Sequence, residues 1–462
     1  MRLTLLALIA LPSLGFAQGA LTPPGAPAPA MKSLDQIEAR TVIGAVGGSF
    51  AAISIDSAGS YVLLGNLSVR AGSGITINAD NVTLDLNGFT ISSSANPAAG
   101  NAIYLPAGRQ NIVVRNGHIG GSGTVNASTG AFSGTGFNSG IYCSQTLNNC
   151  SVSDLTISSV AAYGIWLDLG SIIDRCAATH CGYTGIRGQT VTNCSSTSCG
   201  KTAIQGTTVS NSQGASVTDA GISATTASNC IGTSTSGIGL KAAGSAINCT
   251  GTTQTGTYGL RVATDDAPPV EGTAENCKGT AAGGTGTGLS AGSASNCIGQ
   301  AVAGSGVSAG QSALNCHGQS STGTGLSAGQ SATNCHGSSI DGDGLFTSTA
   351  DTCSGSSISG YGLRADIASN SSAFSNSGTG LDCTAAASNC KGESTSGVGL
   401  SARNSTNCNG RSSTGDMGLR AYGTANGCTG NRPSGIALRA TIAIGCNAIA
   451  GTIEAPSKYN MP

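Results

Sequence analysis

Charged side chains are scarce in this chain of 462 residues: Asp, Glu, Lys and Arg make up 9% and nearly cancel, leaving a net charge of -1. Nucleic acid is therefore not an expected partner, because a protein that neutralises phosphates needs a basic surface. Aromatic residues are also few, at 4% with one Trp, which predicts little stacking surface for sugar rings. Beyond the N-terminus there is no apolar run of about 18 residues, so no membrane span is expected.

The first residues are typical of a secretory signal peptide. Arg2 is followed by the apolar run 3–11 and by the small residues of Gly15-Phe16-Ala17. We therefore predict a signal peptide over residues 1–17, a mature chain that begins near Gln18, and a secreted or periplasmic protein. No cysteine follows this cleavage site directly, so no lipid anchor is expected.

The sequence divides the rest of the chain into three parts. Residues 18–45 are predicted to be a linker and an N-terminal cap, since 21–29 is rich in Pro and Ala and 32–40 could form a short helix. Residues 46–455 carry the repeats described next. Residues 456–462 are predicted to be a C-terminal tail.

An Asn-Cys pair returns every 18 to 20 residues over most of the chain, and a Gly-Leu-x-Ala element follows about ten residues later. The pairs are Asn193-Cys194, Asn229-Cys230, Asn248-Cys249, Asn276-Cys277, Asn296-Cys297, Asn315-Cys316, Asn334-Cys335, Asn389-Cys390 and Asn407-Cys408. Self-similarity at this period is typical of a solenoid. One coil for each apolar strand position gives roughly eighteen coils from Ile75 to Leu438.

The short apolar segments predict strands, because β-branched residues alternate with polar ones and helix signals are absent. Coils stacked about 4.8 Å apart would align equivalent side chains in columns. We expect the Leu and Ala of Gly-Leu-x-Ala to point inward, and Cys to form a second interior column. The Asn before each Cys is expected at a bend, where stacked amides bond along the axis.

Three segments carry a family resemblance: residues 59–67, residues 74–89 with Gly74-Ile75-Thr76-Ile77 and Val82-Thr83-Leu84-Asp85-Leu86, and residues 114–119. They resemble secreted bacterial proteins with right-handed parallel β-helix repeats, the pectin-lyase-like group. The resemblance implies an all-β, single-stranded parallel β-helix. A coil of 18 residues also fits a left-handed β-helix, but variable coil lengths and irregular hexapeptides favour the right hand.

The resemblance specifies fold better than activity, since the group holds lyases, hydrolases, epimerases and members without known chemistry. Its enzymes use clustered carboxylates, sometimes with calcium, plus a basic residue. The paired-Asp, Gly-His-Gly and Arg-Ile-Lys elements of the polygalacturonase branch are missing here, as is the lyase-type calcium cluster. Calcium is the one cofactor that the resemblance allows. The weak catalytic candidates are Asp154, Asp168, Asp174, Arg175 and His180, whose alternative role is to cap bends in solvent.

Eighteen cysteines in an exported chain raise the question of disulfides and metal. Thiols in one column have parallel Cβ directions, which suits buried, reduced thiols better than disulfides. Cys143 with Cys150, and Cys383 with Cys390, are the better disulfide candidates. The weak metal candidates are Cys176, Cys181, Cys194 and Cys199, whose spacing could form a square of thiols beside His180. The simpler interpretation is an extra interior cysteine in two neighbouring coils.

The sequence therefore predicts a secreted β-helix that acts as a structural or surface-interaction module, with polysaccharide or a cell-surface glycan as the expected partner. The alternative is a polysaccharide lyase or glycoside hydrolase that acts on an acidic polysaccharide. The Ser- and Thr-rich bends, such as residues 320–322 and 412–414, would bind glycan or ice only if they formed one flat row.

Overall fold

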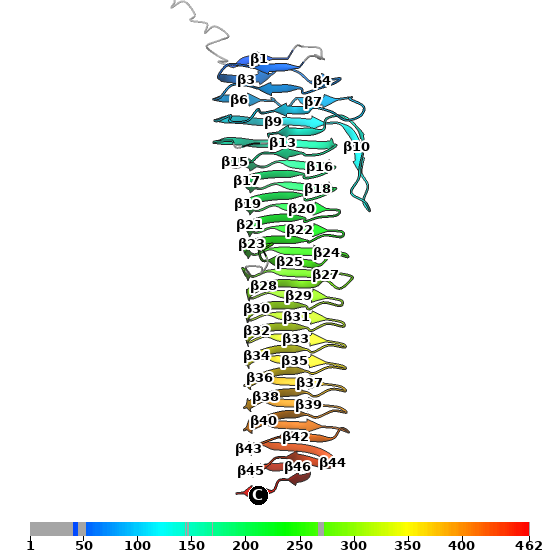
Figure 1. Ribbon diagram of the computed structural model, residues 1–462, viewed down its shortest axis with the longest axis vertical. Helices are drawn as coiled ribbons and strands as arrows, with labels where there is room; N and C mark the ends of the chain where they lie inside the picture. Colours follow the sequence, from blue (N-terminus) through cyan, green and yellow to red (C-terminus); the bar gives the residue numbers. More distant parts are fainter. Residues whose placement is uncertain are drawn as a thin grey trace, which may run out of the picture. The chain divides into compact units, whose positions relative to one another are not determined.

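The fold is a parallel β-solenoid of about 21 turns, as the repeat period predicts (Figure 1). The computed structural model describes residues 40–44, 52–143, 145, 147–168, 170–266 and 272–461. These residues contain strands and no helix. None of them belongs to a helix that could cross a membrane. The predicted signal peptide, the Pro-rich linker and all but the last residue of the helix expected over 32–40 lie outside the described residues.

Each turn carries strand segments on three faces, which we name A, B and C in chain order. In the first coils, the strands of face A are β2 (Ile53–Ile55), β5 (Ile75–Ile77), β8 (Asn101–Tyr104), β12 (Ser139–Tyr142) and β14 (Ile165–Trp166). Those of face B are β1 (Thr41–Ile43), β3 (Gly59–Leu63), β6 (Val82–Asp85) and β15 (Ser171–Asp174), and those of face C are β4 (Leu67–Val69), β7 (Thr90–Ser93) and β16 (Ala177–Cys181). Two long strands cover faces B and C together, namely β9 (Ile112–Gly120) and β13 (Cys150–Val160).

From residue 186 the coils become regular, with one long strand over faces A and B and one short strand on face C. The long strands are β17 (Ile186–Thr192), β19 (Ile204–Ser210), β21 (Ile222–Ser228), β23 (Leu240–Ile247), β28 (Thr287–Ser295), β30 (Val307–Leu314), β32 (Leu326–Thr333), β34 (Leu345–Asp351), β36 (Leu363–Ser369), β38 (Leu381–Ser388) and β40 (Leu400–Thr406). The short strands are β18 (Ser195–Cys199), β20 (Gln213–Ser216), β22 (Ile231–Ser234), β24 (Thr250–Thr253), β27 (Lys278–Ala281), β29 (Ile298–Ala301), β31 (His317–Ser320), β33 (His336–Ser339), β35 (Ser354–Ser357), β37 (Ser372–Ser375), β39 (Lys391–Ser394) and β41 (Asn409–Ser412).

Two insertions depart from this pattern. The Gly-rich segment after β9 forms an antiparallel hairpin, β10 (Ser122–Val125) and β11 (Phe132–Thr135), which runs alongside the stack in Figure 1. The loop around Asp265 splits one long strand into β25 (Tyr258–Val262) and β26 (Thr273–Glu275). Both insertions interrupt the turns without breaking the parallel pairing on either side.

The parallel pairing extends beyond residues 46–455 at both ends. Strand β1 pairs with β3, although it lies within the predicted linker and cap. The last coils contain β42 (Met417–Ala421), β43 (Thr424–Asn426), β44 (Thr429–Arg439), β45 (Ile442–Ile444), β46 (Asn447–Glu454) and β47 (Ser457–Tyr459). Strand β47 pairs with β45, so residues 457–459 of the predicted tail belong to the final coil.

The predicted inner column of face A is confirmed. All eighteen apolar positions from Ile75 to Leu438 are paired in register with the next coil. Leu326 and Ala328 are both fully buried, because alternate residues of a strand face the same side. This column forms one wall of a single continuous core.

Glycines let faces A and C approach each other at their shared edge. A Cβ on Gly325 would lie 2.4 Å from the backbone nitrogen and oxygen of Ser338 on face C, and one on Gly337 would lie 2.1 Å from the carbonyl oxygen of Gly344. Real Cβ atoms essentially never come this close to backbone. The Gly of Gly-Leu-x-Ala is therefore required by the narrow cross-section of the solenoid.

The Asn of each Asn-Cys pair lies at the corner between faces B and C, as predicted. Asn315 and Asn334 adopt the left-handed conformation, with φ of 53° and 51°, which Asn tolerates better than most residues. The Asn315 amide donates to Asn296 Oδ1 at 3.1 Å, and the Asn334 amide donates to Asn315 Oδ1 at 2.8 Å. The amides therefore form the expected ladder along the axis.

Cysteine follows Asn because this corner needs a small buried group that can both donate and accept. The Cys316 thiol, 2% exposed, donates to the carbonyl of Leu314 at 3.3 Å. The Cys316 amide donates to the sulfur of Cys335 in the next coil at 3.4 Å. The column thus contains weak hydrogen bonds as well as apolar packing.

Two serines in the same column support this explanation. Ser212 and Ser371 stand where the other coils have Cys, and each hydroxyl donates to the carbonyl two residues earlier at 2.7 Å. Cys150 is not part of the column, although its spacing suggests it. It begins face B opposite Ser171, whereas Leu155 holds the column position beside Cys176.

The first hydroxyl of each Ser- and Thr-rich bend lies inside the protein and not on an outer row. Ser320 and Ser412 are buried, at 3% and 0% exposure. Ser320 Oγ donates to the carbonyl of Gly304 at 2.7 Å and accepts from the amide of Gly323 at 3.0 Å. These hydroxyls hold the turns together inside the protein.

All eighteen thiols are free and buried, so we expect them to be inert in the folded protein. Burial keeps a reagent in solution away from the sulfur atoms of all eighteen residues. Titration with a thiol-reactive disulfide should label almost none of the native protein and all eighteen cysteines after denaturation. Rapid labelling of many thiols without denaturant would contradict their burial.

Candidate ligand-binding face

The x residue of Gly-Leu-x-Ala points outward on face A and forms a column along the rod. Each member is paired in register with its neighbours through successive coils. In the early coils the column contains Tyr104, Tyr142, Trp166 and Arg187. The largest side chains of a chain poor in aromatics therefore follow one another on one face.

Four aromatic rings gather there in a cluster that we call the aromatic ledge: Tyr142, Tyr163, Trp166 and Tyr183. The ring centroids of Tyr163 and Trp166 are 4.1 Å apart, and those of Tyr142 and Tyr163 are 5.9 Å apart with an interplanar angle of 16°. Tyr183 lies 6.0 Å from Tyr163 and is 48% exposed. Tyr142, Tyr163 and Trp166 are half-buried, so the ledge presents partly exposed rings, which suits contact with the apolar faces of sugars.

Polar groups border the aromatic ledge on the side of the next coil along the chain. The guanidinium carbon of Arg187 lies 4.1 Å from the ring centroid of Trp166, and Arg187 Nη2 lies 3.6 Å from Asp168 Oδ1. A shallow cavity of about 150 Å³ next to them is lined by Asp168, Arg187, Gln189 and Gln205, among others. Such a set of donors and acceptors beside aromatic rings can orient a polyhydroxylated ligand.

The β10–β11 hairpin forms a wall beside Tyr183. A cleft of about 410 Å³ lies between the hairpin residues 129–132 and the turns that carry Tyr183 and Lys201. The Asn126 side chain caps the hairpin turn by accepting from the amides of Ser128 and Thr129, both at 2.9 Å. The Gly-rich insertion therefore bounds one side of the aromatic ledge.

Three of the predicted catalytic residues meet at the corner between faces B and C. Arg175 Nε lies 2.7 Å from Asp154 Oδ1, and Arg175 also pairs with Asp174. The hydrogen bond from Arg175 lowers the pKa of Asp154. Asp174 also accepts from Asn193 Nδ2 at 2.8 Å. Asp154 and Arg175 have φ of 56° and 51°, so they replace Asn in the corner ladder and bond to one another.

The other two candidates lie elsewhere. Asp168 belongs to the border of the aromatic ledge, through its pair with Arg187. His180 lies at the end of β16, in the left-handed conformation with φ of 53°. The structure therefore does not bring the five residues together into one constellation.

The four predicted metal-binding thiols form two pairs rather than a square. Cys176 lies beside Cys194 and Cys181 beside Cys199, because β16 and β18 pair in register. Five residues of β16, with His180 in the left-handed conformation among them, separate the two pairs by at most roughly 16 Å. In the described ranges, no group of three or more His, Cys, Asp or Glu side chains could hold a metal ion.

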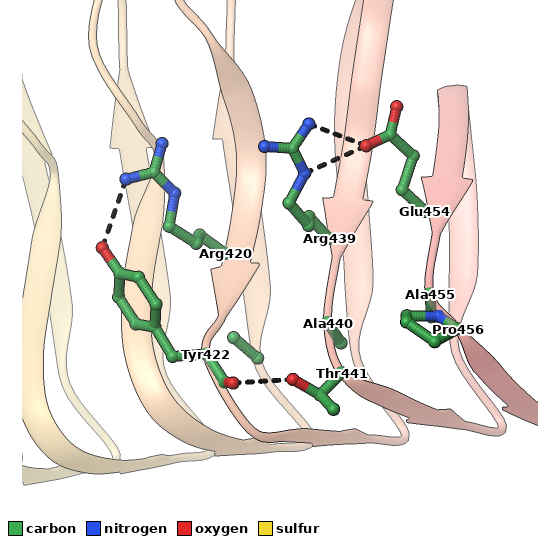
Figure 2. Close-up of a pocket in the computed structure, with 9 residues that line it drawn as sticks. Arg420, Tyr422, Arg439, Ala440, Thr441, Glu454, Ala455 and Pro456 are labelled. Carbon is green, nitrogen blue, oxygen red and sulfur yellow. Dashed lines mark hydrogen bonds and ion pairs between the residues drawn. The ribbon is translucent and has the colours of Figure 1, made fainter.

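A second hollow on face A lies near the end of the chain, with a volume of about 460 Å³. Figure 2 shows Arg420 and Arg439 on adjacent coils, with Tyr422 and Glu454 beside them. Arg439 donates twice to Glu454 Oε2, at 2.7 and 2.9 Å, and Arg420 donates to the Tyr422 hydroxyl at 3.3 Å. This hollow repeats the combination of guanidinium, ring and carboxylate found at the aromatic ledge.

Sequence reasoning missed the aromatic ledge, because the count of aromatic residues says nothing about their arrangement. The usable signal was the x position itself: Gly140-Ile141-Tyr142, Gly164-Ile165-Trp166 and Gly185-Ile186-Arg187 place large side chains at successive outward positions. Tyr163 and Tyr183 lie in the turns that precede face A. Because these turns differ in length, sequence spacing does not indicate that the two rings lie close together.

No protein-family model and no curated protein matches the chain. Two solved structures show a remote likeness. The A-module of mannuronan C-5 epimerase AlgE6 of Azotobacter vinelandii is 10% identical, with a TM-score of 0.25, over 88% of this chain and 90% of that one. ORF18 of Geobacillus virus E2 is 9% identical, with a TM-score of 0.18, over 69% of this chain and 52% of that one. Neither likeness bears on the activity of this protein.

Proposed function

We propose that this protein is a secreted surface-interaction module that binds polysaccharide through the aromatic ledge on face A. The observation that carries the proposal is the gathering of Tyr142, Tyr163, Trp166 and Tyr183 on one outward surface. Partly exposed rings bordered by Arg187 and Asp168 supply stacking and hydrogen bonding together. The predicted catalytic residues favour the enzyme alternative less, since Asp154, Asp174 and Arg175 bond to one another.

Removing the central ring should weaken polysaccharide binding. We expect Trp166→Ala to lower affinity at least ~10-fold, because central aromatic anchors each contribute more than about 1–2 kcal/mol to binding. The measurement is retention of the full chain on immobilised xylan, β-1,4-mannan, mixed-linkage β-glucan, chitin and polygalacturonate, followed by calorimetry.

The matched control is Phe374→Ala. Phe374 is 44% exposed on face C, away from the ledge, so its loss should leave binding unchanged. Equal binding by wild type and Trp166→Ala, with both folded by circular dichroism, would refute the proposal. Release of unsaturated or reducing ends that is lost in Asp154→Asn would favour the enzyme alternative instead.

A further inference from the structure

Guanidinium groups meet aromatic rings at four places along face A. Among the described residues, the arginines at these places are Arg187, Arg261, Arg364 and Arg420, in contact with Trp166, Tyr258, Phe346 with Tyr361, and Tyr422. All four arginines occupy the outward column of face A. The rings lie in that column or at the borders of the face.

A carboxylate lies beside the arginine at the first three places, and at the fourth it lies beside Arg439, which follows Arg420 on the next coil. Its distance to a guanidinium nitrogen is 3.6 Å for Asp168–Arg187, 3.6 Å for Asp265–Arg261, 3.5 Å for Asp343–Arg364 and 2.7 Å for Glu454–Arg439. We call each combination of ring, guanidinium and carboxylate a station. The same three chemical groups therefore recur although the residues come from unrelated sequence contexts.

The stations recur every three to five coils. Four coil steps separate Arg187 from Arg261, five separate Arg261 from Arg364, and three separate Arg364 from Arg420. At about 4.8 Å per coil, neighbouring stations are roughly 14–24 Å apart and the series covers roughly 60 Å. Most positions between them carry a small side chain, such as Ser223, Ser308 and Ser327, so little projects between stations.

We infer that face A binds one linear, uncharged polysaccharide chain that lies along the rod axis and touches all four stations. This inference rests on the proposed function and adds the direction, the length and the class of the ligand. Rings stack on sugar faces, and a guanidinium beside a carboxylate offers donors and acceptors to hydroxyl groups. Along face A the basic side chains of Arg187, Lys241, Arg261, Arg364, Arg420 and Arg439 are nearly balanced by the carboxylates of Asp168, Asp265, Asp343, Asp382 and Glu454, so little net positive charge remains to attract a polyanion.

Ligand length is the test, because several linked contacts raise affinity through effective concentration. The probes are size-fractionated xylan, β-1,4-mannan and mixed-linkage β-glucan, measured by calorimetry with the full chain. Fragments shorter than roughly 20 Å should bind weakly, and fragments longer than roughly 60 Å should bind at least ~100-fold more tightly.

The double variant Phe346→Ala with Tyr422→Ala removes rings from two distant stations, with side chains 39% and 64% exposed. It should lose at least ~10-fold of the affinity for long fragments and none for short ones, while Phe374→Ala should change neither. Binding that is independent of length, or unchanged in the double variant, would overturn the inference and leave the aromatic ledge as a single site. Tight binding of polygalacturonate that disappears at high salt would overturn the uncharged class, and binding of no polysaccharide would refute the proposed function itself.

Discussion

Gly325→Ala should destabilise the solenoid by about 2–3 kcal/mol, although it adds one methyl group. The added carbon would lie 2.4 Å from the backbone nitrogen and oxygen of Ser338. Backbone cannot rotate away as a flexible side chain can, so faces A and C would have to separate. The free energy of unfolding from denaturant titration measures the effect.

The matched control is Gly244→Ala, which is the same substitution made at an exposed glycine. Its Cβ would meet the carbonyl of Thr225 at 3.4 Å, an ordinary contact, and its φ does not require glycine. We expect a change within about 0.5 kcal/mol. If the two variants were equally stable, the close approach of faces A and C would be wrong.

Cys316→Asp should destabilise the central coils by several kcal/mol, because it places a carboxylate without a cationic partner in the thiol column. Burial would raise the pKa of that carboxyl, so the deficit relative to wild type should be full at pH 7 and shrink toward roughly pH 4, as the carboxyl becomes protonated in the folded state. The measurement is the free energy of unfolding of both proteins across this pH range.

Two milder substitutions separate charge from volume at the same site. Cys316→Ala should cost about 1–3 kcal/mol, through a small cavity and the lost bond to the carbonyl of Leu314. Cys316→Ser should cost less than about 1 kcal/mol, because Ser212 and Ser371 already make the equivalent bond in the same column. An Asp variant as stable as the Ser variant would show that the column is open to water.

The fold could be predicted because stacked coils turn sequence period into spatial columns. The apolar residue of Gly-Leu-x-Ala, the Cys after Asn, and the Asn itself each fall in one column as expected. Spacing alone does not place Cys150. The early coils have corners of different length, so Cys150 lies at the start of face B and not in the cysteine column. Pairing of the first and last strands also exceeded the predicted bounds, since short strands such as β1 carry little periodic signal.

The candidate site was harder to predict, because it depends on which turn residues meet across coils. Trp166 and Tyr163 are close in sequence, but Tyr183 reaches them only through the stacking of the next coil. Conversely, the spacing of Cys176, Cys181, Cys194 and Cys199 suggested a square, whereas pairing of β16 with β18 brings them together as two pairs, at the two ends of these strands.

Side-chain footprinting with hydroxyl radicals tests the central claim most directly, since it reports which rings a bound polysaccharide covers. The protein should be labelled alone and with saturating long xylan, β-1,4-mannan and mixed-linkage β-glucan. The account predicts protection of Trp166, Tyr258, Phe346 and Tyr422 on face A by the bound glycan, and unchanged labelling of Phe374 on face C. Protection of Phe374, with the face A rings labelled as in the free protein, would contradict it.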